Sequence, residues 1–219
     1  MYSQNLAAGS FASPKIIESE ILVFDNVFKK PEWESFVYLV EKWESRFVET
    51  ETGDDNVKEL DKSKRDSLVL FDFEPIYSFL RVQLYKYAFL VEKQLGYKMQ
   101  LDKGFECQLT AHNDKHFYTA HTDFNPGTGT KVSEREITFV YYFHREPKSF
   151  EGGELFLWDH LESDAFPLPR ADQGKYIEPK NNRLIIFPSK YWHEVRPISC
   201  PSKAFMDSRF TLNGWFHKS

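Results

Sequence analysis

Apolar residues in the first half of the chain recur at helical spacing. After Pro31 they fall every three to four positions, which predicts a helix of about 16 residues; they are Phe36, Val40, Trp43 and Phe47. A second apolar face runs from Pro75 to Gly96, where a glycine is a typical helix C-terminus. The pattern therefore predicts two helices, the second of them continuous.

After Tyr97 the helical period fades, and short β-rich runs separated by turn residues replace it. The runs predict eight strands, near 105–111, 117–123, 135–144, 154–158, 175–179, 183–187, 192–198 and 208–216. Three segments lack any apolar period and are interpreted as loops: 49–66, 124–134 and 159–174. Two helices followed by a series of strands predict an α+β domain with a β-sandwich or jelly-roll core.

Composition narrows the class of protein. The chain has 219 residues, of which 41% are apolar and 28% charged, so one globular domain is expected. The formal net charge of -5 disfavours binding to nucleic acids or to anionic membranes, which requires a positive surface. Two cysteines exclude a disulfide framework and predict a reducing, cytoplasmic location. Neither a secretory signal nor a long apolar run is found, so no membrane partner is expected.

One short motif offers two metal ligands on one strand face. In His121-Thr122-Asp123, residues i and i+2 of a strand point the same way, so the imidazole and the carboxylate project together. His193 lies 70 residues after Asp123 and enters another predicted strand. Two histidines and one carboxylate on one face of an octahedron are typical of non-haem Fe(II) oxygenases. Taken alone, His-x-Asp is a pattern that also arises by chance, and the other five histidines are interpreted as structural or surface residues: His112, His116, His144, His160 and His217.

Arg209 supplies the second part of the chemistry. The run 207–216 alternates, with Phe210, Leu212 and Phe216 on one face and Arg209, Thr211, Asn213 and Trp215 on the other. An arginine inside a small barrel is costly unless an anion meets it, and a guanidinium binds a carboxylate as a two-pronged fork. A dicarboxylate cosubstrate would satisfy Arg209 with one end and chelate the metal with the other. The alternative is a surface or salt-bridged arginine.

Four ordered motifs resemble the Fe(II)- and 2-oxoglutarate-dependent dioxygenases, in particular their prolyl-4-hydroxylase-like branch. They are His121-Thr122-Asp123, the Gly-Gly-Glu-Leu run that ends at Leu155, the region from Asn182 through His193 to Pro197, and the closing run from Arg209 to Phe216. The resemblance covers residues 105–217, about half of the chain. The interval between His193 and Arg209 is longer than is usual in the family, and residues 199–205 are therefore interpreted as an enlarged hairpin loop.

This resemblance implies a fold and a set of roles. The fold would be a double-stranded β-helix, or jelly roll, in one domain over 1–219, with a loose arm at 1–15, helical support at 16–100 and the catalytic core at 101–219. His121, Asp123 and His193 would hold Fe(II), and Arg209 would anchor the 2-oxoglutarate tail. Further cosubstrate-binding candidates are Tyr142, Thr211, Asn213 and Tyr118. Dioxygen would be consumed, with ascorbate as a candidate reductant.

The sequence alone leaves alternatives open for the substrate that is hydroxylated. The resemblance favours a prolyl residue in a protein or peptide; the alternative is a free amino acid or a natural-product intermediate. Since relatives that halogenate replace the carboxylate with a small residue, Asp123 favours hydroxylation. A third reading, from a different class, is a non-catalytic jelly-roll module that binds a metal or ligand. The sequence does not indicate an oligomeric state.

Overall fold

The computed structural model describes residues 15–53, 58–99, 105–127 and 129–218. Three α-helices lie in this part of the chain: α1 (Lys30–Lys42), α2 (Ile76–Tyr85) and α3 (Ala88–Leu95). Short 3₁₀ turns occupy Glu44–Arg46, Lys131–Glu134 and Phe205–Asp207. The predicted loose arm falls almost wholly outside the described residues.

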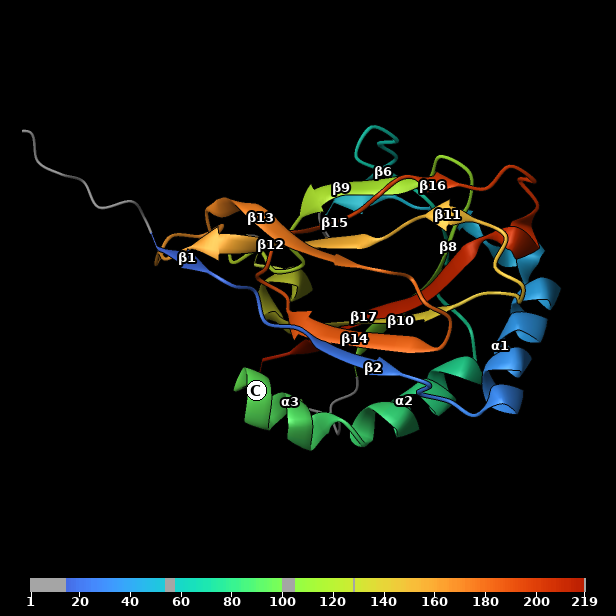
Figure 1. Cartoon of the computed structure of the whole chain (residues 1–219), viewed down its shortest axis with the longest axis horizontal. Helices are drawn as coiled ribbons and strands as arrows, with labels where there is room; N and C mark the ends of the chain where they lie inside the picture. The colour runs from blue at the N-terminus through green and yellow to red at the C-terminus, as the bar shows by residue number, and fades with distance from the viewer. Residues whose placement is uncertain (1–14, 54–57, 100–104, 128, 219) are drawn as a thin grey trace, which may run out of the picture.

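Two antiparallel sheets dominate the molecule (Figure 1). The first has seven strands in the order β2 (Leu22–Asp25), β14 (Arg183–Pro188), β10 (Arg135–Phe143), β17 (Arg209–His217), β8 (Glu106–His112), β7 (Leu68–Leu70) and β3 (Val48–Glu49). The second has the order β1 (Ile16–Ile17), β12 (Leu155–Leu161), β15 (His193–Val195), β9 (Phe117–His121) and β6 (Arg65–Asp66), with β13 (Arg170–Ile177) also paired to β12. Two small pairs complete the pattern: β11 (Glu151–Gly152) with β16 (Ile198–Ser199), and β4 (Thr52–Gly53) with β5 (Lys58–Glu59).

The seven-stranded sheet is covered on both faces, which explains the alternation along its strands. Phe139, Tyr141 and Phe143 of β10 pack in one apolar cluster with residues of the three helices. Val140 and Tyr142 belong to a separate cluster that includes residues of β12 and β13. Because successive strand residues face opposite ways, β10 separates the helical layer from the second sheet. The same alternation holds in β17, as predicted.

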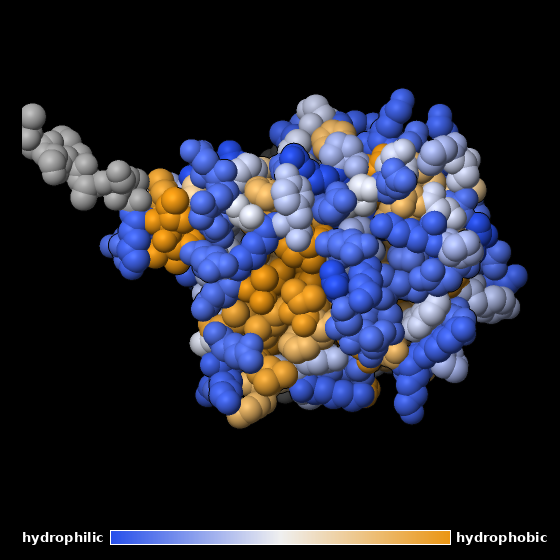
Figure 2. Space-filling view, in the orientation of Figure 1, coloured by the Kyte–Doolittle hydropathy of each residue, from blue (hydrophilic) through white to orange (hydrophobic). Residues whose placement is uncertain are grey.

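The surface follows from this layering. Figure 2 shows polar residues covering most of one face of the molecule, with apolar side chains gathered where the two sheets meet beside β2. Both cysteines, Cys107 and Cys200, are free. None of the helices within the described ranges is long and apolar enough to cross a membrane.

The predicted second helix is wrong in one respect, because it is two helices. The backbone N–H groups of Lys86 and Tyr87 donate to the carbonyls three residues earlier, which tightens the turn between α2 and α3. The Tyr87 ring packs 4.2 Å from the ring of Phe24 on β2. The break lets both apolar faces lie on the sheet. Gly96 ends α3 in the left-handed conformation, as its position predicted.

Seven of the eight predicted strands are confirmed as single strands, and the eighth, 192–198, is divided between β15 and β16. The interpretation of the N-terminal region as helical support needs correction. Seven short strands, β1 to β7, also lie there, and β2, β3, β6 and β7 extend the two main sheets. The predicted loop 49–66 therefore contains paired strands at its described positions. The predicted loop 159–174 is also too long, since β12 continues to Leu161 and β13 begins at Arg170. These strands are held by backbone pairing, β4–β5 and β12–β13 as local hairpins and β1, β2 and β6 with distant strands, so they need no apolar period of their own.

Candidate functional site

A cavity of about 620 Å³ opens between the two sheets. Its lining combines residues from both: Thr138, Arg209 and Thr211 come from the first sheet, and His121 and His193 from the second. Its volume is in the range of small-molecule binding sites. The packing of the sheets thus brings all the predicted site residues except Tyr142 into the lining of one cavity, and Tyr142 is fully buried.

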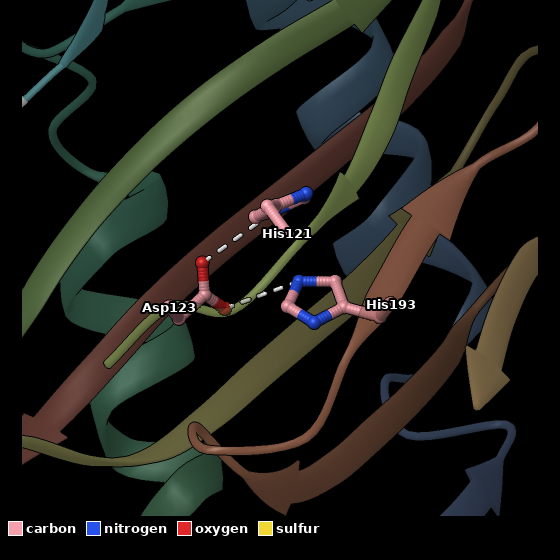
Figure 3. A group of neighbouring side chains, drawn as sticks. All are labelled: His121, Asp123 and His193. Atoms are coloured by element: carbon pink, nitrogen blue, oxygen red, sulfur yellow. Dashed lines mark ion pairs between the residues drawn. The ribbon is translucent and has the colours of Figure 1, made fainter. Parts of the chain in front are cut away.

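His121, Asp123 and His193 form a compact group of possible metal ligands (Figure 3). His121 ends β9 and His193 begins β15, and the two are direct partners in the antiparallel pairing of these strands. One ligand atom from each of the three residues lies within 4.8 Å of the others. The Nε2 atom of His193 is 3.3 Å from Oδ2 of Asp123, and that of His121 is 3.7 Å from Oδ1.

Backbone and hydroxyl groups orient the three side chains. Nδ1–H of His121 donates to the carbonyl of Thr119 at 2.8 Å, and Nδ1–H of His193 donates to that of Tyr191 at 3.0 Å. Both Nε2 lone pairs are thereby directed to the carboxylate side, the arrangement that orients metal-binding histidines. The Thr138 hydroxyl donates to Oδ2 of Asp123 at 2.8 Å. Asp123 lies just past the end of β9, and its backbone N–H donates to Ser189.

The electrostatics of the group suit a cation. Burial, reinforced by the nearby His193, lowers the pKa of His121 to about 3, so its imidazole is neutral at neutral pH. Burial would raise the pKa of Asp123, but His193 and His121 outweigh this and hold that pKa well below its usual range. Neutral imidazole and ionised carboxylate are the forms that bind metals, and His121 and Asp123 are in these forms, whereas Asp123 outweighs burial and raises the pKa of His193. Two nitrogen donors and one carboxylate oxygen fit a three-ligand Fe(II) site with open positions.

Arg209 is a deeply buried cation in the same cavity, with 2% of its surface exposed. Its Nη1–H donates to Nδ1 of His112 at 3.1 Å, and its guanidinium carbon lies 5.0 Å from the centre of the Tyr142 ring. Among the described residues no carboxylate forms an ion pair with it. A desolvated cation without a counterion is costly, so this position favours an anionic ligand.

Three buried polar atoms around Arg209 have no hydrogen-bond partner among the described residues: Nε of Arg209, Oη of Tyr142 and Nε2 of His112. Since Nδ1 of His112 accepts from Arg209, its Nε2 carries the proton and is a donor. Burial and the adjacent guanidinium hold the pKa of His112 well below its usual range, which keeps the ring neutral. All three atoms are therefore donors that an anion would satisfy.

His112 was missed by the sequence reasoning, which treated it as structural or surface. It lies directly opposite Arg209 in the pairing of β8 with β17. Its even spacing from Thr110 and Gln108, which also line the cavity, puts it on the inner face of β8. This alternation was a usable signal, but the partner strand was not known.

The remaining predicted residues line the cavity in different ways. The Tyr118 ring stacks on that of His121, with 3.6 Å between ring centres. Thr211 and Asn213 also face the cavity, but they are occupied with each other and with Thr110 through hydrogen bonds of 2.5 to 3.2 Å. Tyr118 thus lies beside the candidate metal ligands, whereas Thr211 and Asn213 form a bonded polar layer.

Comparison with solved structures supports this fold. A prolyl-4-hydroxylase from Pseudomonas putida matches with a TM-score of 0.62 at 15% identity, covering 92% of this chain and 94% of the other. A prolyl hydroxylase from Trichoplax adhaerens, in complex with a peptide fragment of the hypoxia inducible factor oxygen degradation domain, matches with a TM-score of 0.65 at 17% identity, covering 90% and 83%. At such low identity the likeness concerns the fold.

Sequence comparison identifies the family. An uncharacterised PKHD-type hydroxylase from Synechocystis sp. is 46% identical over 113 residues, which are 52% of this chain and 36% of that protein. The match therefore spans about a third of the length of the relative. The family model of the 2OG-Fe(II) oxygenase superfamily matches residues 107–217, about half of the chain and the part that carries both the three candidate ligands and Arg209. This chain belongs to the 2OG-Fe(II) oxygenase superfamily.

Proposed function

We propose that this protein is an Fe(II)- and 2-oxoglutarate-dependent hydroxylase of an unactivated C–H bond. One observation carries the proposal: a two-histidine, one-carboxylate group shares one cavity with an arginine that has no counterion among the residues the structure describes. The first suits a divalent metal and the second a carboxylate, so together they suit a dicarboxylate that also chelates the metal.

In this proposal His121, Asp123 and His193 hold the iron. With 2-oxoglutarate bound, the iron would activate dioxygen, so that one oxygen atom goes to the substrate C–H and the other to succinate, with release of CO₂. Thr138 keeps the Asp123 carboxylate in position through its 2.8 Å hydrogen bond. The stacked Tyr118 ring shields His121 from water on one side.

Arg209 anchors the distal carboxylate of 2-oxoglutarate in the same proposal. His112 and Tyr142 add uncharged donors that also lack partners in the described residues. Thr211 and Asn213 lie beside the anchor in the cavity lining, where the Thr211 hydroxyl and the Asn213 amide oxygen are hydrogen-bonded to each other and to Thr110. Ascorbate is included only as a candidate reductant of the iron.

The fold proposal is a double-stranded β-helix in a single domain over 1–219. Its support is that two antiparallel sheets face each other around the cavity and that strands from before residue 100 extend both sheets. The two free cysteines support a reducing, cytoplasmic location.

For the acceptor we propose a prolyl residue in a protein or peptide, with a free amino acid or a natural-product intermediate as the alternative. The support is the structural likeness to prolyl hydroxylases, one of which was solved with a peptide. Turnover decides between them: succinate release is screened against proline-containing peptides and against free amino acids. Activity on free amino acids alone would contradict the peptide proposal.

Anaerobic titration with Fe(II) and 2-oxoglutarate tests the reaction class. A hydroxylase should develop the weak visible charge-transfer band of the iron chelate, whereas a non-catalytic binding module should not. The Asp123→Ala variant should neither develop the band nor couple loss of 2-oxoglutarate to hydroxylation. Wild-type coupled turnover by this variant would show that the metal assignment is wrong.

A further inference from the structure

Three arginines of the described chain line the cavity, and two of them have an evident role. Arg209 is the proposed anchor of the cosubstrate. Arg135 donates to Oε2 of Glu106 at 2.7 Å, and its guanidinium carbon lies 3.7 Å from the centre of the Trp215 ring. The third arginine, Arg65, is explained by neither arrangement.

Arg65 is buried, with only 8% of its surface exposed, and it lines the cavity. It lies in β6 opposite Tyr118 of β9. Its Nε–H donates to the Ser67 hydroxyl at 3.0 Å, and its guanidinium carbon lies 4.8 Å from the centre of the Tyr118 ring. In the described ranges no carboxylate forms an ion pair with it.

Three acidic groups near Arg65 have other partners, and Glu51, which also lines the cavity, forms no ion pair with Arg65 in the described structure. Glu49 pairs with Lys62, and the carboxylate of Asp66 faces His116 at 3.8 Å. The oxygens of Asp123 are directed to His121, His193 and Thr138. A desolvated guanidinium with one hydroxyl and one ring face as its contacts is an unfavourable arrangement unless a ligand completes it.

The position of Arg65 relates this cation to the proposed metal. Its guanidinium lies over Tyr118, and the Tyr118 ring stacks on that of His121. A group bound by Arg65 would therefore sit one aromatic ring away from a candidate iron ligand. Arg209 directly contacts His112 and Tyr142, whereas Arg65 contacts Ser67 and Tyr118, although both arginines lower the pKa of His112.

We propose that Arg65 binds a carboxylate of the primary substrate and thereby holds the substrate beside the metal. This inference rests on the proposed function and narrows its substrate class to molecules that carry a carboxylate near the oxidised C–H. The planar guanidinium fork matches a carboxylate in two parallel hydrogen bonds. The carboxylate can belong to a free amino acid or to an acidic side chain of a peptide, and the test separates these sources.

The test measures binding without turnover. The protein is loaded with redox-inert Zn(II) and saturating 2-oxoglutarate, and its thermal unfolding is followed in the presence of paired pools. One pair contains the standard free amino acids against their amides; the other contains capped peptides that differ only in Glu against Gln. A ligand that binds the folded protein raises the unfolding temperature, and the Kd of the best member is then measured by calorimetry.

At least one carboxylate pool should stabilise the wild-type protein more than its neutral counterpart does. Arg65→Gln should remove this preference and raise the Kd of the carboxylate ligand on the order of 10- to 100-fold. Arg65→Lys, which keeps the charge but not the planar fork, should raise it less. The matched control is Lys30→Gln, which removes an exposed cation of α1 and should change neither the preference for carboxylates nor the Kd of the carboxylate ligand.

Thermal stability without the pools distinguishes a binding role from a structural one. Because no described carboxylate pairs with Arg65, Arg65→Gln should leave the unfolding temperature unchanged or raise it, and 2-oxoglutarate affinity should stay within about twofold. The inference is overturned if no carboxylate pool is preferred, if Arg65→Gln retains the preference, or if 2-oxoglutarate affinity falls instead. Failure of the wild-type protein to bind 2-oxoglutarate at all would overturn the proposed function itself.

Discussion

The Thr138 hydroxyl is the most direct test of how the chain prepares its metal ligands. Thr138 is 2% exposed, and its hydroxyl donates to Oδ2 of Asp123 at 2.8 Å and contacts the Ser189 hydroxyl at 2.9 Å. Thr138→Val keeps the shape of the side chain and removes only the hydroxyl. The Asp123 carboxylate would then lose a buried donor that fixes its orientation.

The magnitude follows from the type of hydrogen bond. A bond to a charged group contributes about 1.5–3 kcal/mol, and loss of a partner that orients a metal ligand weakens metal binding about 10- to 100-fold. We therefore expect Thr138→Val to bind Co(II) or Mn(II) about 10- to 100-fold more weakly. Anaerobic calorimetric titration of the metal-free protein measures this Kd, and chemical denaturation measures the free energy of unfolding.

A control variant separates metal binding from general destabilisation. Ser19 is also fully buried, and its hydroxyl donates to the carbonyl of Trp158 at 2.6 Å, outside the cavity lining. Ser19→Ala should lower the free energy of unfolding by about 1 kcal/mol and leave the metal Kd unchanged. If Thr138→Val loses as much stability as Ser19→Ala but keeps wild-type metal affinity, the reasoning about ligand orientation is refuted.

Three further changes have distinct expected results. Arg209→Met should weaken 2-oxoglutarate binding by at least about 100-fold, because charge-assisted hydrogen bonds are lost. The free protein should keep its unfolding temperature. Calorimetric titration measures the binding and thermal unfolding measures the stability, and a large fall in stability would contradict a ligand-binding role. Gly153→Ala should lower the free energy of unfolding by roughly 1–3 kcal/mol. The reason is that φ of Gly153 is +72° and a Cβ there would lie 2.8 Å from Ile198 and 2.9 Å from Arg209. A wild-type free energy of unfolding in chemical denaturation would contradict this expectation. Asp25, whose pKa Arg183 lowers from 3.8 to about 2, contributes stability above pH 4 that is lost as pH falls toward 2. Asp25→Asn should therefore lower the free energy of unfolding by less than about 1 kcal/mol near pH 6, since the pair is partly exposed. The difference in this free energy between variant and wild type should shrink between pH 4 and pH 2, as denaturation at a series of pH values would measure. A difference that stays constant with pH would exclude this linkage.

The local pattern was sufficient for much of the fold. The two-residue period of the last strand correctly separates Phe210, Leu212 and Phe216, which pack under the helices, from Arg209 and Thr211, which line the cavity. The alternation in β10 likewise places Tyr142 opposite to Tyr141. These predictions succeed because the side chains of a strand alternate whatever the strand pairs with.

The pattern failed where pairing with distant residues decides the conformation. Nothing in 49–66 or 159–174 has the apolar alternation of a strand, yet both contain residues that distant partners hold by backbone pairing: β6 pairs with β9, and the end of β12 pairs with β1. The turn at Lys86 and Tyr87 is a comparable case, since packing on β2 divides a sequence whose helical period is continuous.

By itself, the sequence determined the strand faces and the residue types of the candidate site, because both are local or are carried by short motifs such as His121-Thr122-Asp123. Which cations have no counterion among the described residues depends on the tertiary structure. His112 becomes a donor beside Arg209 through the register of β8 with β17, and Arg65 enters the cavity because β6 pairs with β9. Burial and ion pairing are properties of residues far apart in the chain, so no spacing along the sequence reveals them.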